Sequence, residues 1–139
     1  MHGASSAIED AAKLAGMARE FTEGFNTGDL DRIMQFYGDT YVDVNLRHPV
    51  QSKEERQAYY AQVMRAGRFQ INVQPHEILV QGDIAFVRGS VELTPTDTKS
   101  GVPASTELRY LEIVRKQTDG SWKVMWGMDG PVQEYDPAK

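Results

Sequence analysis

Three carboxylates interrupt segments of alternating, largely apolar sequence and are the residues most able to carry out chemistry: Asp43, Glu112 and Asp129. Burial among apolar groups raises the pKa of a carboxylic acid and allows it to exchange protons near neutral pH. Because an isolated buried charge costs a large free energy, such a carboxylate is either paired or functional. The sequence therefore indicates general acid–base chemistry in an apolar pocket, provided that the carboxylates have no partners.

Asp43 lies between Tyr41 and Asn45 at two-residue spacing on a predicted short strand, residues 41–46. Side chains at this spacing share one face of a strand, so all three could point into one cavity. The alternative is that they line the solvent edge of the strand. If the cavity exists, we expect Asp43 or Asp129 to be the base and Tyr41 to donate a hydrogen bond to a developing oxyanion.

Glu112 follows Tyr110 by two residues on the apolar face of a predicted strand. The favoured interpretation is a cross-strand ion pair with an arginine, and the candidates are Arg88, Arg109 and Arg115. The alternative is a position in the pocket, where Tyr110 would be a further hydrogen-bond donor. For Asp129, which ends the last predicted strand, pairing and a pocket role are equally supported.

Histidine is the side chain best suited to proton transfer near pH 7. His48 lies in an irregular segment before Pro49, near the expected mouth of the pocket, and is either a catalytic residue and hydrogen-bond donor or an exposed loop residue. His76, which follows a proline in a predicted strand, is a weaker candidate. Three scattered histidines without any cysteine have no metal-ligand spacing, so we expect neither a metal nor a cofactor.

Five aromatic residues are candidates for the core or for the wall of a pocket that binds a flat apolar molecule: Tyr59, Tyr60, Phe86, Trp122 and Trp126. Packing in the core is the simplest explanation for each of them. We also assign Tyr59, Phe86 and Trp126 to the pocket.

Residues 106–130 predict two strands joined by a tight turn, because apolar and aromatic residues alternate on both sides of Asp119-Gly120. Both faces of these strands carry large apolar side chains. We therefore expect helices to cover one face and a second chain to cover the other.

The rest of the chain predicts three helices and further strands. Ser6 with Glu9, and Ser52 with Glu55, have the spacing of a capping box, and Asp29 is typical of an N-cap. The predicted helices are residues 6–26, 29–37 and 52–66, and the predicted strands are 41–46, 69–81 with a bend at Pro75, and 84–94. Residues 95–105 predict a loop.

Helices followed by long antiparallel strands are typical of an α+β domain. We expect a cone-shaped α+β barrel, in which three N-terminal helices pack on a curved, mostly antiparallel sheet and leave an open mouth. The predicted domain spans residues 8–130, between a disordered N-terminal tail, 1–7, and a C-terminal tail, 131–139. A length of 139 residues suits one domain with a substantial core.

Composition excludes several classes of function. The net charge is −5, and the 15 Lys and Arg are scattered among 20 acidic residues, so there is no basic stripe for nucleic acid. The lack of cysteine excludes disulfides and thiolate catalysis. No apolar run approaches the ~20 residues of a membrane helix, and the N-terminus does not read as a signal peptide. We expect a soluble, cytoplasmic protein without nucleic-acid or membrane partners.

Several local patterns occur in an order that resembles a known superfamily. They are Phe25-Asn26-Thr27-Gly28-Asp29-Leu30-Asp31, the strand 41–45, Gly82-Asp83-Ile84-Ala85, Arg109-Tyr110, and Asp119-Gly120-Ser121-Trp122-Lys123-Val124. Their order and spacing, from about Ile8 to Asp129, resemble the nuclear-transport-factor-2-like superfamily, and within it the SnoaL-like and ketosteroid-isomerase-like proteins.

The resemblance implies a cone with a ligand pocket between the helices and the concave sheet, and dimerisation through the outer face of the sheet. Members of the superfamily include isomerases, cyclases, dehydratases and epoxide hydrolases, as well as non-catalytic association and transport modules. The catalytic members usually place a carboxylate or His in an apolar pocket. They often have an acidic residue or His two positions before Asp129, where this chain has Gly127.

We therefore predict a homodimer that binds a small, mostly apolar molecule. If it is an enzyme, we expect cofactor-free isomerisation, cyclisation, dehydration or hydrolysis. The alternative is a non-catalytic association module, in which the polar groups pair with one another. A sheet face with Leu111, Ile113 and Met125 would then form the contact between copies.

Overall fold

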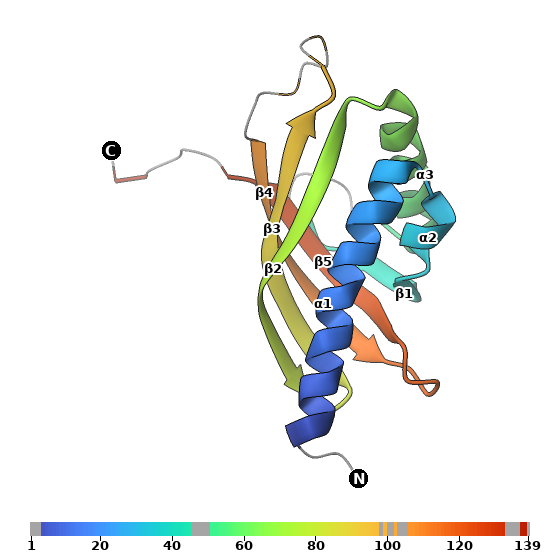
Figure 1. Cartoon of the computed structure of the whole chain (residues 1–139), viewed down its shortest axis with the longest axis vertical. Helices are drawn as coiled ribbons and strands as arrows, with labels where there is room; N and C mark the ends of the chain where they lie inside the picture. The colour runs from blue at the N-terminus through green and yellow to red at the C-terminus, as the bar shows by residue number, and fades with distance from the viewer. Residues whose placement is uncertain are drawn as a thin grey trace.

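The computed structural model describes residues 4–45, 51–97, 99, 102, 106–132 and 137–138. Within these residues, three helices lie on the concave side of a curved five-stranded sheet (Figure 1). The elements are α1 (Ala4–Thr27), α2 (Leu30–Met34), β1 (Tyr37–Asp43), α3 (Lys53–Ala66), β2 (Phe69–Gln81), β3 (Ile84–Pro95), β4 (Thr106–Lys116) and β5 (Trp122–Pro131). The strand order is β1-β5-β4-β3-β2, and only the β1–β5 pair is parallel. The predicted α+β class is confirmed.

The helix α1 runs along the sheet and covers its edge strand, β2 (Figure 1). Its apolar face includes the buried residues Leu14, Ala18 and Phe25. Near the end of the helix, the Asn26 side chain donates to the carbonyl of Ile71 at 2.9 Å and accepts from the N–H of the same residue at 2.8 Å. A helix side chain thus takes the place of a neighbouring strand at this sheet edge.

The start of α1 differs from the prediction. The helix begins at Ala4, so Ser6 lies inside its first turn and is not the N-cap, and residues 4–7 are helical rather than part of a tail. Alanine has the highest helix propensity, which favours extension of the helix through this segment. The predicted end is confirmed, because Gly28 adopts a left-handed conformation with φ of 77°.

The second helix is shorter than predicted, and the short strand begins earlier. Asp29 is the N-cap of α2, as predicted, and accepts from the backbone N–H of Arg32 at 3.1 Å. The helix ends at Met34, and β1 begins at Tyr37 because residues 37–43 pair in parallel with β5. Pairing with a buried strand thus overrides the helical spacing of the apolar residues.

Both predicted ends of α3 are confirmed. Ser52 and Glu55 form the capping box, each side chain accepting from the backbone N–H of the other at 3.2 Å. Gly67 ends the helix with φ of 60°. Between these ends, Arg56 and Tyr60 lie one turn apart and are both buried.

The predicted bend in β2 is a β-bulge at His76. Pro75 pairs with Gly89 and Glu77 pairs with Arg88, which leaves His76 without an opposite residue. Gly89 is required here, because a Cβ atom would lie 2.1 Å from a backbone oxygen of β2. The bulge lets two strands of unequal length curve together around α1.

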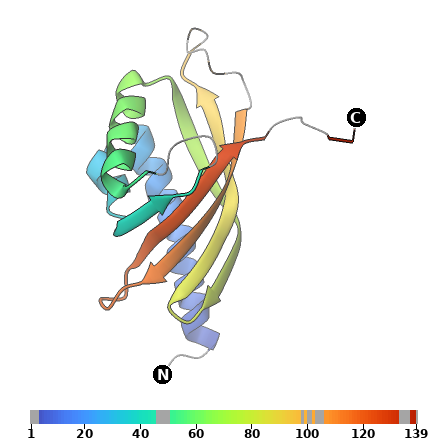
Figure 2. The same cartoon turned by 180° about the vertical axis from the view of Figure 1, so that it is seen from behind.

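The outer face of the sheet is turned toward the viewer in Figure 2. This face carries an apolar row across four strands. Its members pair in succession and are Leu79, Phe86, Ile113 and Trp126. Phe86 is 42% exposed, Trp126 is 39% exposed and Tyr59 on α3 is 40% exposed. None of the three lines the cavity described below, so their assignment to a pocket is wrong.

Strand alternation explains both outer aromatic residues. Ala85 and Val87 are buried on the concave side, so Phe86 between them faces outward. The pairing of β5 with β4 shifts by one residue. Val114 pairs with Val124, whereas the residue before Val114 pairs with Trp126, which leaves one residue of β5 without an opposite residue. The extra residue in β5 reverses the alternation, and Trp126 faces away from the core.

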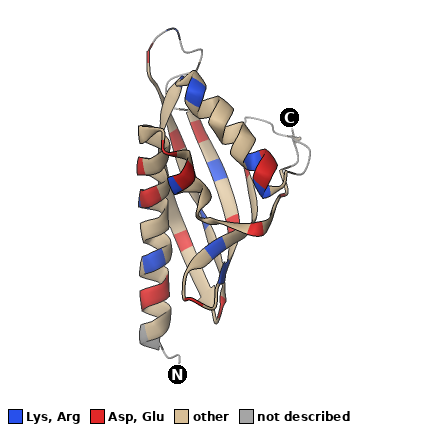
Figure 3. Cartoon of the chain, turned by 90° about the vertical axis from the view of Figure 1, so that its right-hand side faces the viewer, with Lys and Arg blue, Asp and Glu red and all other residues tan. Residues whose placement is uncertain are grey.

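Charged residues of both signs are interspersed along the described helices and strands (Figure 3). Among those residues, no helix is long and apolar enough to span a membrane. The largest side chains with less than 2% exposure are Ile33, Val114 and Asp43. A carboxylate in this set points to the functional site.

Candidate functional site

A cavity of about 100 Å³ lies between α1, α3, β1 and the concave face of the sheet. Much of its wall is apolar: Leu14, Met17, Phe21, Val73, Val87, Val91, Val114 and Val124. The wall also contains four tyrosines and three charged residues: Tyr37, Tyr41, Tyr60, Tyr110, Arg56, Glu112 and Asp129. An apolar wall with a few polar groups is typical of a small-molecule site.

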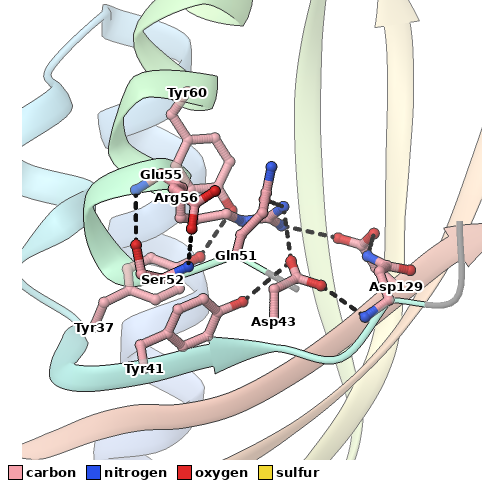
Figure 4. Close-up of polar contacts among 10 residues, drawn as sticks. Tyr37, Tyr41, Asp43, Gln51, Ser52, Glu55, Arg56, Tyr60 and Asp129 are labelled. Carbon is pink, nitrogen blue, oxygen red and sulfur yellow. Dashed lines mark hydrogen bonds and ion pairs between the residues drawn. The ribbon is translucent and has the colours of Figure 1, made fainter. Parts of the chain in front are cut away.

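Arg56, the fourth residue of α3, joins two of the predicted carboxylates (Figure 4). Its Nη1 lies 3.0 Å from Oδ2 of Asp43, and its Nη2 lies 3.2 Å from Oδ2 of Asp129. Nη1 also donates to Gln51 at 3.3 Å, and the guanidinium lies over the Tyr60 ring, 4.8 Å from its centroid. Burial alone would lower the pKa of Arg56, but the tyrosine hydroxyls and Asp129 raise it, so the guanidinium stays charged.

Asp43 is held in a network that satisfies both carboxylate oxygens. Besides Arg56, the Tyr41 hydroxyl donates to Oδ2 at 3.4 Å, and the backbone N–H of Asn45 donates to Oδ1 at 2.8 Å. The Asn45 side chain in turn donates to Asp129 at 2.9 Å. Tyr41, Asp43 and Asn45 are all buried, so the alternative of a solvent edge is wrong. Of the three, only Tyr41 lines the cavity, so the predicted pocket position of Asp43 and Asn45 is also wrong.

Glu112, in contrast, has no hydrogen-bond or ion-pair partner among the described residues. It lies on the concave face of β4, where its neighbours in register are Val87 on β3 and Gly127 on β5. Neither neighbour has a polar side chain. The Glu112 carboxylate therefore lines the cavity without a polar neighbour on the adjacent strands.

The favoured interpretation of Glu112, an ion pair with an arginine on a nearby strand, is wrong. Arg88 pairs instead with Glu77 at 2.6 Å, and both side chains are exposed on the outer face. Arg109 and Arg115 each lie three residues from Glu112 on β4, so alternation places their side chains on the opposite face. The position in the pocket, which was the alternative, is where the structure places Glu112.

Burial raises the pKa of Glu112 to about 7; the charge of Arg56 opposes this rise and the charge of Asp129 adds to it. A carboxyl group with this pKa is present in both protonation states near neutral pH. It can therefore accept or donate a proton under physiological conditions.

Tyr110 precedes Glu112 by two residues on the same face, and its hydroxyl has no partner among the described residues. Burial, and then the charge of Glu112, raise the pKa of Tyr110 above its usual value, so the phenol stays a neutral donor. The hydroxyls of Tyr37 and Tyr60 lie 2.8 Å apart and satisfy each other. Burial raises the pKa of both. Among the four cavity tyrosines, Tyr110 is thus the available donor.

Arg56 is the functional residue that the sequence interpretation missed. It lies four residues before Tyr60 and therefore on the same helical face. A basic residue on the buried face of a helix was the available signal. Gly127 also has a structural explanation, because a Cβ atom there would lie 3.2 Å from the Tyr41 hydroxyl.

Only one of the two candidate histidines can be placed relative to the cavity. His48 lies outside the described residues. His76, at the bulge, contacts the Ser90 hydroxyl through Nε2 at 3.0 Å and does not line the cavity. In the described part of the chain, no group of three or more His, Asp or Glu has an arrangement that could hold a metal ion.

Three helices on a curved open sheet, with an apolar cavity between them, define a class of cone-shaped α+β proteins. Residues 18–125 match the model of the SnoaL-like domain family. The match covers most of the sequence, and the chain belongs to this family. No curated protein matches the chain significantly.

Solved structures agree with this assignment. A ketosteroid isomerase-like protein from Erwinia carotovora atroseptica is 24% identical, with a TM-score of 0.72 over 88% of this chain and 96% of that chain. A proposed dehydratase of the nuclear-transport-factor-2-like family from Streptomyces avermitilis is 19% identical, with a TM-score of 0.73 over 92% and 99%. A proposed calcium/calmodulin-dependent protein kinase type II association domain from Thiobacillus denitrificans is 16% identical, with a TM-score of 0.68 over 84% and 93%. At these identities the likeness shows the fold alone.

Proposed function

We propose that the protein binds a small, mostly apolar molecule in the cavity and catalyses acid–base chemistry on it without a cofactor. In this proposal Glu112 transfers the proton and Tyr110 donates a hydrogen bond. The supporting observation is that the Glu112 carboxyl group faces the cavity without a described partner and has a pKa of about 7. Isomerisation, cyclisation, dehydration and hydrolysis are all compatible with such a site.

The simplest reaction starts with a carbonyl compound in the cavity. The Glu112 carboxylate removes a proton from the carbon next to the carbonyl group, and the electron pair of the C–H bond moves toward the carbonyl oxygen. The Tyr110 hydroxyl donates a hydrogen bond to the resulting oxyanion. Glu112 then returns the proton to a different carbon, which gives an isomer, or to a leaving oxygen, which gives an elimination.

Asp43 and Asp129 have a supporting role in this proposal instead of the role of base. Each is engaged by Arg56, so proton transfer through either carboxylate would require an ion pair to break. The charged network stabilises the wall behind the cavity. Glu112 stays outside this network, so it can change its protonation state without breaking an ion pair.

Native mass spectrometry followed by an exchange assay tests the proposal. The mass retained by the purified protein identifies a ligand, which is then incubated in D2O with wild type, Glu112→Gln and Glu77→Gln. Glu77 lies on the outer face, so its variant is the matched control. We expect exchange or turnover with wild type and the control, and a loss of about 100-fold or more with Glu112→Gln. Unchanged rates in Glu112→Gln would contradict the assignment.

A second copy of the chain is the partner that we propose for the outer face. The apolar row supports this proposal, because Leu79, Phe86 and Trp126 in it are exposed and Ile113 between them is partly buried. Leu111 is exposed on the same face, but Met125 is buried beside Gly38, so its predicted place in the contact is wrong. This row also favours the second candidate function, a non-catalytic association module. A dimer without a retained molecule and without proton exchange would support that candidate.

A further inference from the structure

The charges around the cavity do not balance. Arg56 is the only cation among the described residues of the wall. It is paired with Asp43 and Asp129, so one guanidinium faces two aspartates and the set carries a net charge of −1. Ionised Glu112 would add another negative charge to the same space.

Arg56 is not available to bind an anion. Its terminal nitrogens are occupied by Asp43, Asp129 and Gln51. Its Nε–H has no hydrogen-bond partner among the described atoms, but this atom has almost no accessible surface. A ligand anion in the cavity would therefore meet carboxylates and no free counter-ion.

The groups that do face the cavity suit a cation. Glu112 offers a carboxylate without a described partner, and a carboxylate can accept several hydrogen bonds at once. Aromatic rings from Tyr37, Tyr41, Tyr60 and Tyr110 surround the same space. The faces of aromatic rings attract ammonium groups, and more strongly where water is excluded.

We propose that the cavity binds a molecule with one basic amino group on an apolar body, with Glu112 as the counter-ion of the ammonium group. The proposal rests on the proposed function and narrows its substrate class. One oxygen of Glu112 would hold the ammonium group while the other stays free to accept a substrate proton. The cavity volume of about 100 Å³ limits the apolar body to about the size of one aromatic ring.

Binding of an ammonium group has a predictable pH dependence. The cation favours the ionised form of Glu112. Arg56 and Asp129 act on it from α3 and β5, Tyr37 and Tyr41 face it from β1, and Tyr110 lies beside it on β4. Near neutral pH the Glu112 carboxyl group is protonated in a fraction of the molecules, so binding of the cation releases protons at this pH. The affinity for an amine therefore rises as the pH rises through 7.

Three probes of similar shape and different charge test this inference: benzylamine, benzyl alcohol and benzoate. Their dissociation constants are measured by NMR titration below and above the pKa of Glu112, with wild type, Glu112→Gln and the control Glu77→Gln. Above this pKa we expect benzylamine to bind about tenfold or more tightly than benzyl alcohol, and benzoate to bind most weakly. The preference for the amine should be smaller at the lower pH, absent in Glu112→Gln and unchanged in the control.

Equal binding of benzyl alcohol and benzylamine at both pH values, or tightest binding of benzoate, would overturn the inference. If Glu112→Gln does not fold, calorimetry of benzylamine binding to wild type in two buffers of different ionisation enthalpy decides the question. Proton release supports the inference and its absence overturns it. A separate titration of Glu112 distinguishes the two proposals: a pKa near 7 without amine preference contradicts only this inference, whereas a pKa near 4.5 also contradicts the proposed function.

Discussion

Two charged clusters connect the helices to the sheet, and they differ in how many donors they provide for their carboxylates. Near the start of α1, the single carboxylate of Asp10 accepts from Trp122 Nε1 and pairs with Lys116, both at 3.2 Å. At the cavity, one guanidinium, that of Arg56, is the cation for three nearby carboxylates: it pairs with Asp43 and Asp129, and Glu112 remains outside the network.

The protonation of these carboxylates follows from the number of donors. Burial on its own would raise the pKa of Asp10, but the hydrogen bonds from Trp122 and Lys116 lower it below the usual 3.8. Burial raises the pKa of Glu112 to about 7, because no donor opposes it directly. Burial alone thus does not decide whether a carboxylate is structural or reactive. The partners within reach decide it.

The largest expected effect is the loss of stability when the shared guanidinium of Arg56 is removed. Arg56→Met leaves the buried Asp43 and the partly buried Asp129 without a counter-ion, which should lower the free energy of unfolding by about 3–5 kcal/mol. Urea denaturation measures the change. Arg88→Met, which removes an exposed pair, is the control and should cost less than about 1 kcal/mol. An Arg56→Met variant as stable as this control would contradict the account of the network.

The second effect is the pH dependence of stability due to Glu112. Its folded-state pKa of about 7 exceeds the ordinary 4.5, so between these values the folded state binds more protons than the unfolded state, and stability falls as the pH rises. At about 1.36 kcal/mol for each pH unit, the fall is about 3 kcal/mol. Denaturation of Glu112→Gln across this range should lack the fall, and a curve parallel to that of wild type would contradict the prediction.

The pH dependence of stability due to Asp10 should have the opposite sign. Its folded-state pKa is lowered, so its contribution is present above pH 3.8 and is lost as the pH falls through the folded-state pKa. Asp10→Asn should cost about 1–3 kcal/mol at neutral pH, because Lys116 and Trp122 lose a charged acceptor. Thermal denaturation of the two proteins should converge in acid. A difference that persists there would show that the lost charge is not its cause.

The smallest expected effect is a shift in the pKa of Glu112, and it tests the electrostatic explanation most specifically. Asp129 raises the pKa of Glu112 and Arg56 lowers it, so Asp129→Asn should lower this pKa whereas Arg56→Met should raise it. A substitution that only admitted water to the cavity would lower the pKa in both variants. NMR titration of the Glu112 carboxyl carbon measures the two shifts, and shifts of the same sign would contradict the electrostatic explanation.

The sequence predicted the features that depend on neighbouring residues. The capping box of Ser52 and Glu55, the end of α3 at Gly67 and the turn at Gly120 each depend on a few adjacent positions. The bend at Pro75 follows from the missing N–H of proline. These local signals were sufficient for the α+β class and for most element boundaries.

The site depends on register and on distant contacts, which local patterns do not specify. Trp126 faces outward because one extra residue in β5 reverses the alternation. Arg56 meets Asp129 across 73 positions of sequence. The assignment of Phe86 to the pocket, by contrast, was avoidable. Phe86 lies between two small apolar residues of β3 that are buried, and alternation then puts its side chain on the outer face.

Glu112 is the carboxyl group that lines the cavity without a paired counter-ion, and its titration distinguishes this state from a solvated or paired one. Carbon-13 NMR of the side-chain carboxyl groups, with Glu112→Gln to assign the signal, follows its protonation as the pH changes. We expect a midpoint of about 7. A midpoint near the ordinary 4.5 would show that Glu112 is solvated or paired, and would contradict its role in proton transfer.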